Sequence, residues 1–232
     1  MSSAYGRIDR PKEYDSSKLE LLLPIESLTK LNEQVSVHSL ITILKQLNDE
    51  SKLIVYLQTL LNNEIDAGNT YPQKYPLNLT EFKNYFLSGD AFIVIKSGKN
   101  VSIDFSNDLE KTILGTFYIK PNFPGRCSHI CNGGFITSAI HRNQGIGKIM
   151  GKAFIEIVPL LGYRASMFNL VFANNIPSVR LWRSLGFQEI GRVPKAGYLI
   201  KKNEATKQAN AEEEEEEEEE FVDAIMFYYS FV

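Results

Sequence analysis

The segment from Arg142 to Lys148 combines residue types that together bind a phosphate group. Gly145 and Gly147 follow an apolar stretch typical of a strand, and they open a stretch over 145–161 whose apolar spacing favours a helix. The first N–H groups of a helix lack partners within it and carry partial positive charge, and glycine lets a phosphate approach them closely. Because Arg142 and Lys148 add cationic donors, the pattern Arg-x-x-Gly-x-Gly predicts a site for a pyrophosphate. It matches neither the P-loop nor the dinucleotide pattern.

The run Cys127-Ser-His129-Ile-Cys131 is a second group of residues with chemical potential. Three soft ligands within five residues suit zinc, but no fourth ligand follows at a suitable spacing, so we predict no metal site. Two cysteines also do not make a disulfide framework. His129 stays open as a base that acts through water.

The charge of the chain is unevenly distributed. The formal net charge is −3, but nine acidic residues form the single run Glu212–Glu220, and without them the remainder would be about +6. A mildly basic folded part suits a polyanionic ligand. A hydrophobic content of 44% over 232 residues is enough for one domain with a sizeable core.

The sequence also bears on compartment and membrane association. No apolar run approaches the roughly 18 residues that span a membrane, so no membrane segment is predicted. The N-terminal stretch Met1–Tyr14 lacks the apolar core of a secretion signal and contains Asp9 and Glu13, which a mitochondrial presequence usually avoids. We expect a cytoplasmic protein, with the nucleus as a further compartment, rather than a mitochondrial one.

The elements that must position the glycine loop predict an α/β (α+β) fold with helices on both faces of a sheet. Apolar periodicity favours helices in five places, although residues 41–44 also suit an extended segment. Residues 1–18 are expected to be a loose tail, 19–200 and 221–232 a single domain, and 201–220 an acidic insert of low complexity. The expected helices cover 36–47, 51–67, 78–87, 145–161 and 177–185, and the expected strands 19–25, 91–95, 112–120, 133–138, 165–172, 187–193 and 221–231.

Two motifs carry a resemblance to a known family. Arg142-x-x-Gly145-x-Gly147 resembles the acetyl-CoA signature of the GCN5-related N-acetyltransferase (GNAT) superfamily. The stretch from Asn175 to Leu185-Gly-Phe resembles its second signature, in which an Asn opens a helix that ends in Leu-Gly-Phe. The resemblance implies a mixed, mostly antiparallel central sheet that splays between its fourth and fifth strands, here 133–138 and 165–172, with acetyl-CoA as co-substrate in the gap. The implied cofactor contacts are Phe135, Ile136, Thr137, Arg142, Asn143, Gln144, Gly145, Ile146, Gly147, Lys148 and Asn175.

A narrower resemblance concerns the acceptor. The segments 64–73, 115–122, 126–129, 168–172, 193–197 and 222–225 are similar to the fungal L-azetidine-2-carboxylate (proline-analogue) acetyltransferases. The likeness implies direct transfer to a small amine, and it implies a homodimer. Asn132, Asn169 and Leu170 would bind the acceptor. Asn169 and Asn175 would be catalytic, with Asn175 orienting the attacking nitrogen or a proton-accepting water, since an amide is not itself a base.

Several alternatives stay open. Asn175 stands where an asparagine caps a helix. Many superfamily members carry a Tyr at the position of Trp182 to protonate the leaving thiolate, so packing is the expected role of Trp182 here. A related acetyltransferase domain occurs in a fungal histone-gene regulator, so the acceptor could instead be a protein (histone) or a polyamine, or the chain a non-catalytic acetyl-CoA-binding transcription regulator. Nucleic-acid binding is disfavoured because the sequence has no zinc-finger spacing and no long basic stripe.

Overall fold

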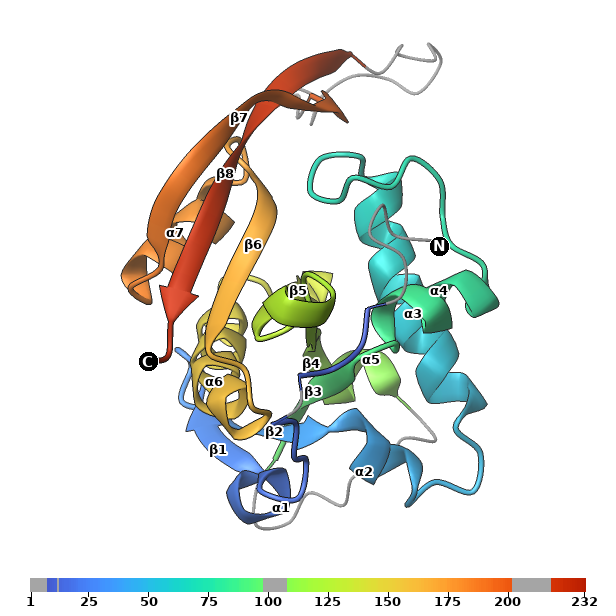
Figure 1. Ribbon diagram of the computed structural model, residues 1–232. Coiled ribbons are helices and arrows are strands. Elements are labelled where there is room, and N and C mark those ends of the chain that lie inside the picture. Colours follow the sequence, from blue (N-terminus) through green and yellow to red (C-terminus); the bar gives the residue numbers. More distant parts are fainter. Residues whose placement is uncertain (1–7, 12, 98–107, 202–217) are drawn as a thin grey trace, which may run out of the picture.

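A computed structural model describes residues 8–11, 13–97, 108–201 and 218–232 (Figure 1). The strands are β1 (Ile25–Leu28), β2 (Gln34–Ser39), β3 (Asp90–Lys96), β4 (Ile113–Pro121), β5 (Ile130–Thr137), β6 (Ala165–Phe172), β7 (Gln188–Ile200) and β8 (Glu219–Ser230). The helices are α1 (Leu19–Leu22), α2 (Leu40–Leu44), α3 (Ser51–Asp66), α4 (Leu79–Phe86), α5 (Leu109–Thr112), α6 (Ile146–Leu160) and α7 (Ile176–Ser184), with short 3₁₀ turns η1 (Gly125–Cys127) and η2 (Ala139–His141).

The strands described form one sheet in the order β1-β2-β3-β4-β5-β6-β8-β7. Every neighbouring pair is antiparallel except β5 and β6, which run parallel. Helices α3 and α4 lie on one face of the sheet and α6 on the other (Figure 1). The predicted fold class, a mixed and mostly antiparallel sheet with helices on both faces, is therefore confirmed.

The sheet separates two hydrophobic cores because its strands alternate their side chains between the two faces. On β4, Phe117 packs with the α6 core, whereas its neighbour Tyr118 packs with the α3–α4 core. Phe154 of α6 and Leu57 of α3 are fully buried on their respective sides. Helix α4, which lies within the expected helix over 78–87, begins at a capping box between Asn78 and Glu81.

Two predictions for the N-terminal half were wrong. The expected strand over 19–25 is instead the short helix α1 followed by β1. The expected helix over 36–47 is strand β2 up to Ser39 and helix α2 from Leu40. Val35 and Val37 alternate with the polar residues Ser36 and His38, and both are fully buried in the core on the α6 side of the sheet. This period of two overrides the helical spacing of the residues that follow.

Strands β5 and β6 diverge soon after they begin. They pair only at Ile130 with Ala165 and at Cys131 with Ser166. The predicted splay is therefore present, although these are the fifth and sixth strands because β2 replaces an expected helix. At the far end of the divergence, the Ile200 N–H at the end of β7 donates to the Gly68 carbonyl after α3 at 2.9 Å (Figure 1).

The predicted terminal and acidic segments are only partly described. Within the expected tail, the Tyr14 hydroxyl donates to Asp90 at 2.7 Å, whereas residues 1–7 and 12 lie outside the described residues. Most of the expected acidic insert, residues 202–217, also lies outside them. The two ends that flank it are joined by an ion pair between Lys201 and Glu218 at 2.9 Å. None of the described helices has the length and apolar character needed to cross a membrane.

Candidate active site

The glycine loop leads directly into α6. Gly145 precedes the helix with a φ of 90°, a left-handed conformation that favours glycine, and Asn143 also has a positive φ of 65°. The carbonyl of Gly145 accepts the N–H groups of Lys148 and Ile149 at 3.0 and 3.1 Å, which closes the first turn. The preceding N–H groups of that turn therefore face outward from the helix start, as an anion site requires.

Close packing fixes the start of α6 against the sheet. A Cβ atom placed on Gly115 of β4 would lie 3.1 Å from side-chain atoms of Ile146 and Met150, so the absence of a side chain there lets the helix approach. Ile146 and Met150 are each 1% exposed. The loop is thereby placed beside the end of β5, where Phe135, Ile136 and Thr137 lie beyond the last pairing with β6.

A cluster of asparagine amides lies where β5 and β6 separate. Asn122 and Asn169 form a reciprocal amide pair, in which Asn169 Nδ2 donates to Asn122 Oδ1 at 2.7 Å and Asn122 Nδ2 donates to Asn169 Oδ1 at 2.8 Å. Asn132 Nδ2 approaches the same Asn122 oxygen at 3.5 Å, and Asn132 Oδ1 accepts the Gly133 N–H at 2.8 Å. The structure thus brings the predicted Asn132 and Asn169 together through Asn122.

Asn122 was not among the functional candidates expected from the sequence. Its only signal was its position two residues after Lys120, at the end of a β-rich segment already quoted for its family likeness. The partner that holds it, Asn169, is 47 residues further along the chain, and no local pattern reveals such a contact.

Asn175 caps helix α7 and also faces the site. Its Oδ1 accepts the Ser178 N–H at 3.3 Å, so the capping role left open by the sequence is present. Trp182, one turn after Ser178, donates its indole N–H to the Ser178 hydroxyl at 3.0 Å and is only 3% exposed. Its ring packs on Phe135 and Phe168 with centroid distances of 4.8 and 4.5 Å. Trp182 is therefore a packing residue, as expected.

These residues line a cleft of about 260 Å³. Leu170 lies at its surface and is 43% exposed. Burial raises the pKa of Tyr71 and of Tyr118 well above the usual value, and the Tyr71 hydroxyl has no hydrogen-bond partner among the described residues. The lining residues are Glu64, Thr70, Tyr71, Pro72, Tyr85, Tyr118, Asn132, Gly133, Gly134, Phe135, Phe168, Asn169, Leu170, Val171, Phe172, Asn175, Ser178 and Trp182.

Lys120, a further residue that the sequence did not reveal as a candidate, contacts two tyrosines that line this cleft, Tyr85 and Tyr118. Its Nζ donates to the Tyr85 carbonyl at 2.9 Å and lies 4.2 and 4.4 Å from the ring centroids of Tyr85 and Tyr118. Burial disfavours the charged form and lowers the pKa of the Lys120 ammonium to about 8. The sequence does not reveal that Lys120 lies beside these tyrosines, because Tyr85 belongs to helix α4 and is 35 residues before Lys120 in the chain.

An ion pair joins the glycine loop to the same cleft. The guanidinium of Arg142 pairs with the carboxylate of Glu64, which lines the cleft near the end of α3. Thr70 also donates its hydroxyl to Glu64 at 3.1 Å. The predicted phosphate ligand Arg142 is therefore held by a carboxylate of the cleft wall.

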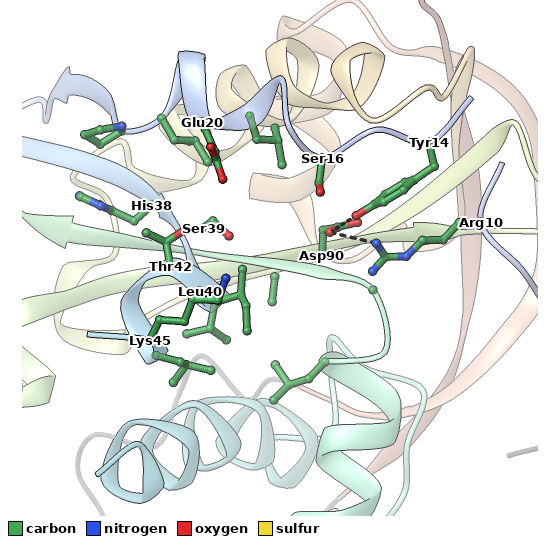
Figure 2. A pocket seen from close by; sticks show the side chains of 18 residues that line it. Arg10, Tyr14, Ser16, Glu20, His38, Ser39, Leu40, Thr42, Lys45 and Asp90 are labelled. Carbon is green, nitrogen blue, oxygen red and sulfur yellow. Dashed lines mark hydrogen bonds and ion pairs between the residues drawn. The ribbon is translucent and has the colours of Figure 1, made fainter. Parts of the chain in front are cut away.

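A second, larger cavity of about 630 Å³ lies between the N-terminal segment, the β2–α2 junction and the start of β3 (Figure 2). Asp90 accepts a hydrogen bond from Tyr14 at 2.7 Å and pairs with Arg10 at 3.5 Å. Burial raises the pKa of Asp90, and burial together with Asp90 raises that of Tyr14 to about 12. None of the predicted site residues lines this cavity, so the smaller cleft is the candidate active site.

The cysteine run does not form a site. Cys127 is exposed, whereas Cys131 is buried and its pKa is raised to about 12 by that burial. His129 contacts the Arg126 carbonyl at 3.2 Å and does not line the cleft. Across the described ranges, no group of three or more His, Cys, Asp or Glu residues is placed to hold a metal ion.

Residues 64–187, which contain the glycine loop and most of the cleft, match the acetyltransferase (GNAT) family. The chain belongs to the GNAT family. It is 40% identical over 156 residues to N-acetyltransferase aca1 of Schizosaccharomyces pombe, covering 65% of this chain and 75% of that protein. It is 30% identical over 184 residues to Protein SPT10 of Saccharomyces cerevisiae, covering 63% of this chain but only 29% of that protein.

The fold of this GNAT protein is also found among solved structures. A GCN5-related N-acetyltransferase from Kribbella flavida superposes with a TM-score of 0.62 at 22% identity, covering 85% of this chain and 98% of the other. Membership of the family confirms the predicted class of enzyme, an N-acetyltransferase that takes its acetyl group from acetyl-CoA.

Proposed function

We propose that this GNAT enzyme acetylates the nitrogen of a small amino or imino acid, such as a proline analogue, by direct transfer in a ternary complex. The observation that carries the proposal is the amide cluster of Asn122, Asn132 and Asn169 at the point where β5 and β6 diverge. A cleft of about 260 Å³ is close to the lower end of small-molecule sites, which begin at roughly 300 Å³.

The start of α6 is where the pyrophosphate of acetyl-CoA would bind. The outward N–H groups of the first turn and the cations of Arg142 and Lys148 supply donors of the right charge. Gln144 donates its amide N–H to the Ile140 carbonyl at 3.3 Å, and its Oε1 is buried without a partner among the described residues, so this side chain would offer the co-substrate an acceptor and not a phosphate donor. Asn143, Gly145, Ile146 and Gly147 supply the backbone of the loop, and the β5 residues Phe135, Ile136 and Thr137 offer the free strand edge to the pantetheine arm.

The acceptor carboxylate would bind the asparagine amides. Asn132 and Asn169 each direct one amide N–H at the Asn122 oxygen, which leaves the second N–H of each side chain for the carboxylate. Amide donors to a carboxylate make charge-assisted hydrogen bonds, which are stronger than neutral ones. Leu170 at the cleft surface would contact the apolar ring of the acceptor.

Asn175 would orient the acceptor nitrogen or the water that takes its proton. Its oxygen is held by the Ser178 N–H, so its amide N–H₂ is turned outward at the start of α7. In the transfer, the new bond joins the nitrogen to the acetyl carbon, the bond from that carbon to sulfur breaks, and the amine proton passes to water. Because a thiol has a pKa of about 8.5, CoA can leave as the thiolate without a dedicated general acid. The Trp182 indole N–H, which already donates to Ser178, is then not needed to protonate the leaving group.

A protein or polyamine amine is the second candidate acceptor. The carboxylate of Glu64 lines the cleft and would attract a cationic chain. The two candidates differ in the acceptor group that the asparagines would bind, because a polyamine has no carboxylate.

Thiol release from acetyl-CoA tests the proposal. We expect release with azetidine-2-carboxylate and little release with spermidine or a lysine peptide. Release with only the latter two would establish the second candidate. Release with none of them, while calorimetry shows acetyl-CoA binding, would make the chain a non-catalytic acetyl-CoA-binding protein. The homodimer and the cytoplasmic or nuclear location stay predictions. Phe227 of the aromatic last strand β8 is fully buried in the core of its own chain.

A further inference from the structure

Lys120 is a partly buried cation that packs against Tyr85 and Tyr118, two residues that line the candidate active-site cleft. Its ammonium contacts the Tyr85 carbonyl and the faces of two tyrosine rings. In the part of the chain that the structure describes, no carboxylate lies within ion-pair distance of it. Burying an ammonium without an anionic partner costs free energy, and cation–π contacts offset only part of that cost. The site therefore favours an anion supplied from outside the chain.

The position of Lys120 places it beside the amide cluster. Lys120 and Asn132 are directly opposite each other in the β4–β5 register, so their side chains lie on the same face of the sheet. Asn122 follows two residues after Lys120 on that face and is bonded to Asn169. A carboxylate held by these amides would thus come next to the ammonium.

We propose that Lys120 binds the carboxylate of the acceptor and so selects amines that carry a carboxylate over amines that do not. This inference rests on the proposed function, because it names the charged residue that sets its acceptor class. Lys120 is a specificity-determining residue, and it takes no part in moving protons at the reacting nitrogen.

The titratable groups around Lys120 determine how its charge changes with pH. Tyr85 of α4 and Tyr118 of β4 are the titratable groups packed against it, and burial keeps Tyr118 protonated by raising its pKa. Asp90 of β3 is opposite Ile119, so its side chain lies on the other face of the sheet. The Lys120 charge is present below its pKa of about 8 and is lost above it. Preference for a carboxylate should fall as pH rises through that value.

The experiment compares azetidine-2-carboxylate with azetidine, the same cyclic amine without the carboxylate. Lys120→Met keeps the apolar stem on the tyrosine rings and removes the charge. We expect it to lower kcat/KM for the carboxylate acceptor about 10- to 100-fold, mainly through KM, and to change kcat/KM for azetidine less than about threefold. Lys120→Arg should retain part of the preference. Lys83→Met, which removes an exposed lysine of α4, is the matched control and should change neither value.

A binding measurement separates this inference from the proposed function. N-acetylazetidine-2-carboxylate and its neutral methylamide are titrated into wild type and Lys120→Met by calorimetry, with acetyl-CoA affinity and circular dichroism as folding controls. We expect the carboxylate to bind wild type at least about tenfold tighter than the methylamide, and equally weakly to the variant. Equal binding of the two ligands by wild type overturns the role of Lys120, even if azetidine-2-carboxylate is acetylated. Tighter carboxylate binding that Lys120→Met abolishes supports it, even if no acetylation occurs and the proposed function fails.

Discussion

The larger cavity and the smaller cleft differ in how their charges are balanced. In the larger cavity, Arg10 and Asp90 form an ion pair and Tyr14 donates a hydrogen bond to Asp90 Oδ1, whereas Asp90 Oδ2 is buried without a hydrogen-bond partner among the described residues. In the smaller cleft, a cluster of amides faces a ligand-sized space, and the Lys120 ammonium behind it has no carboxylate partner among the described residues. The proposed acceptor site therefore rests on the amide cluster and on Lys120, not on cavity volume.

The largest expected effect is in the amide cluster. Asn169→Ala removes an amide that would donate a hydrogen bond to the acceptor carboxylate, and it leaves Asn122 without its reciprocal partner. Hydrogen bonds to charged groups contribute about 1.5–3 kcal/mol each, so kcat/KM for azetidine-2-carboxylate should fall about 100-fold. Asn174→Ala, at an exposed neighbouring asparagine, is the control in the same steady-state assay. An Asn169→Ala enzyme with wild-type kcat/KM would contradict the assignment of the acceptor site.

The next effect concerns the loop at the start of α6. Gly145→Ala forces a side chain into a φ of 90° and should cost about 1–2 kcal/mol of strain, seen as roughly tenfold weaker acetyl-CoA binding by calorimetry. Gly186→Ala is the matched control, because Gly186 has a φ of 85° but lies in the turn after α7. Both variants should lose thermal stability. A similar loss of acetyl-CoA affinity in both would mean that the loop binds no phosphate.

A smaller effect should appear in the ion pair that links the loop to the cleft. Glu64→Gln releases Arg142, so acetyl-CoA should bind about two- to fivefold tighter, within the roughly 1 kcal/mol that a partly exposed pair contributes. The gain should shrink at high salt, since salt screens the pair in the wild type. Calorimetry at two ionic strengths checks both points, and weaker binding by the variant would refute the competition between Glu64 and the co-substrate.

The smallest effect on activity is expected in the larger cavity. Asp90→Asn should leave kcat/KM unchanged while altering stability. Because burial raises the folded-state pKa of Asp90, its stabilising contribution is present below the unfolded pKa and is lost as pH rises through the folded value. The melting temperature of Asp90→Asn relative to wild type should therefore increase between about pH 3.5 and pH 7. A loss of acetyl transfer at constant stability would show that this cavity does belong to the reaction.

The sequence predicted the parts of the site that are local in the chain. The loop from Arg142 to Lys148 and the capped helix after Asn175 are recognisable because each is one continuous segment with its own backbone chemistry. The acceptor end is assembled from α3, α4, β4, β5 and β6, whose contacts depend on the sheet register. Lys120 and Asn122 were missed for that reason, and β2 was misread because its alternation is short and borders a helical spacing.

The contact between Ile200 and Gly68 turns the divergence of β5 and β6 into a bounded opening. At one end the two strands are joined by the pairing of Ile130 with Ala165, and at the other this backbone hydrogen bond joins the end of β7 to the residues after α3. A Cβ atom on Gly68 would lie 2.4 Å from the Ile200 side chain, so the two backbones meet without room for a larger residue. The opening between β5 and β6 is therefore bounded at both ends, and its width depends on how the long β7–β8 hairpin packs against the end of α3.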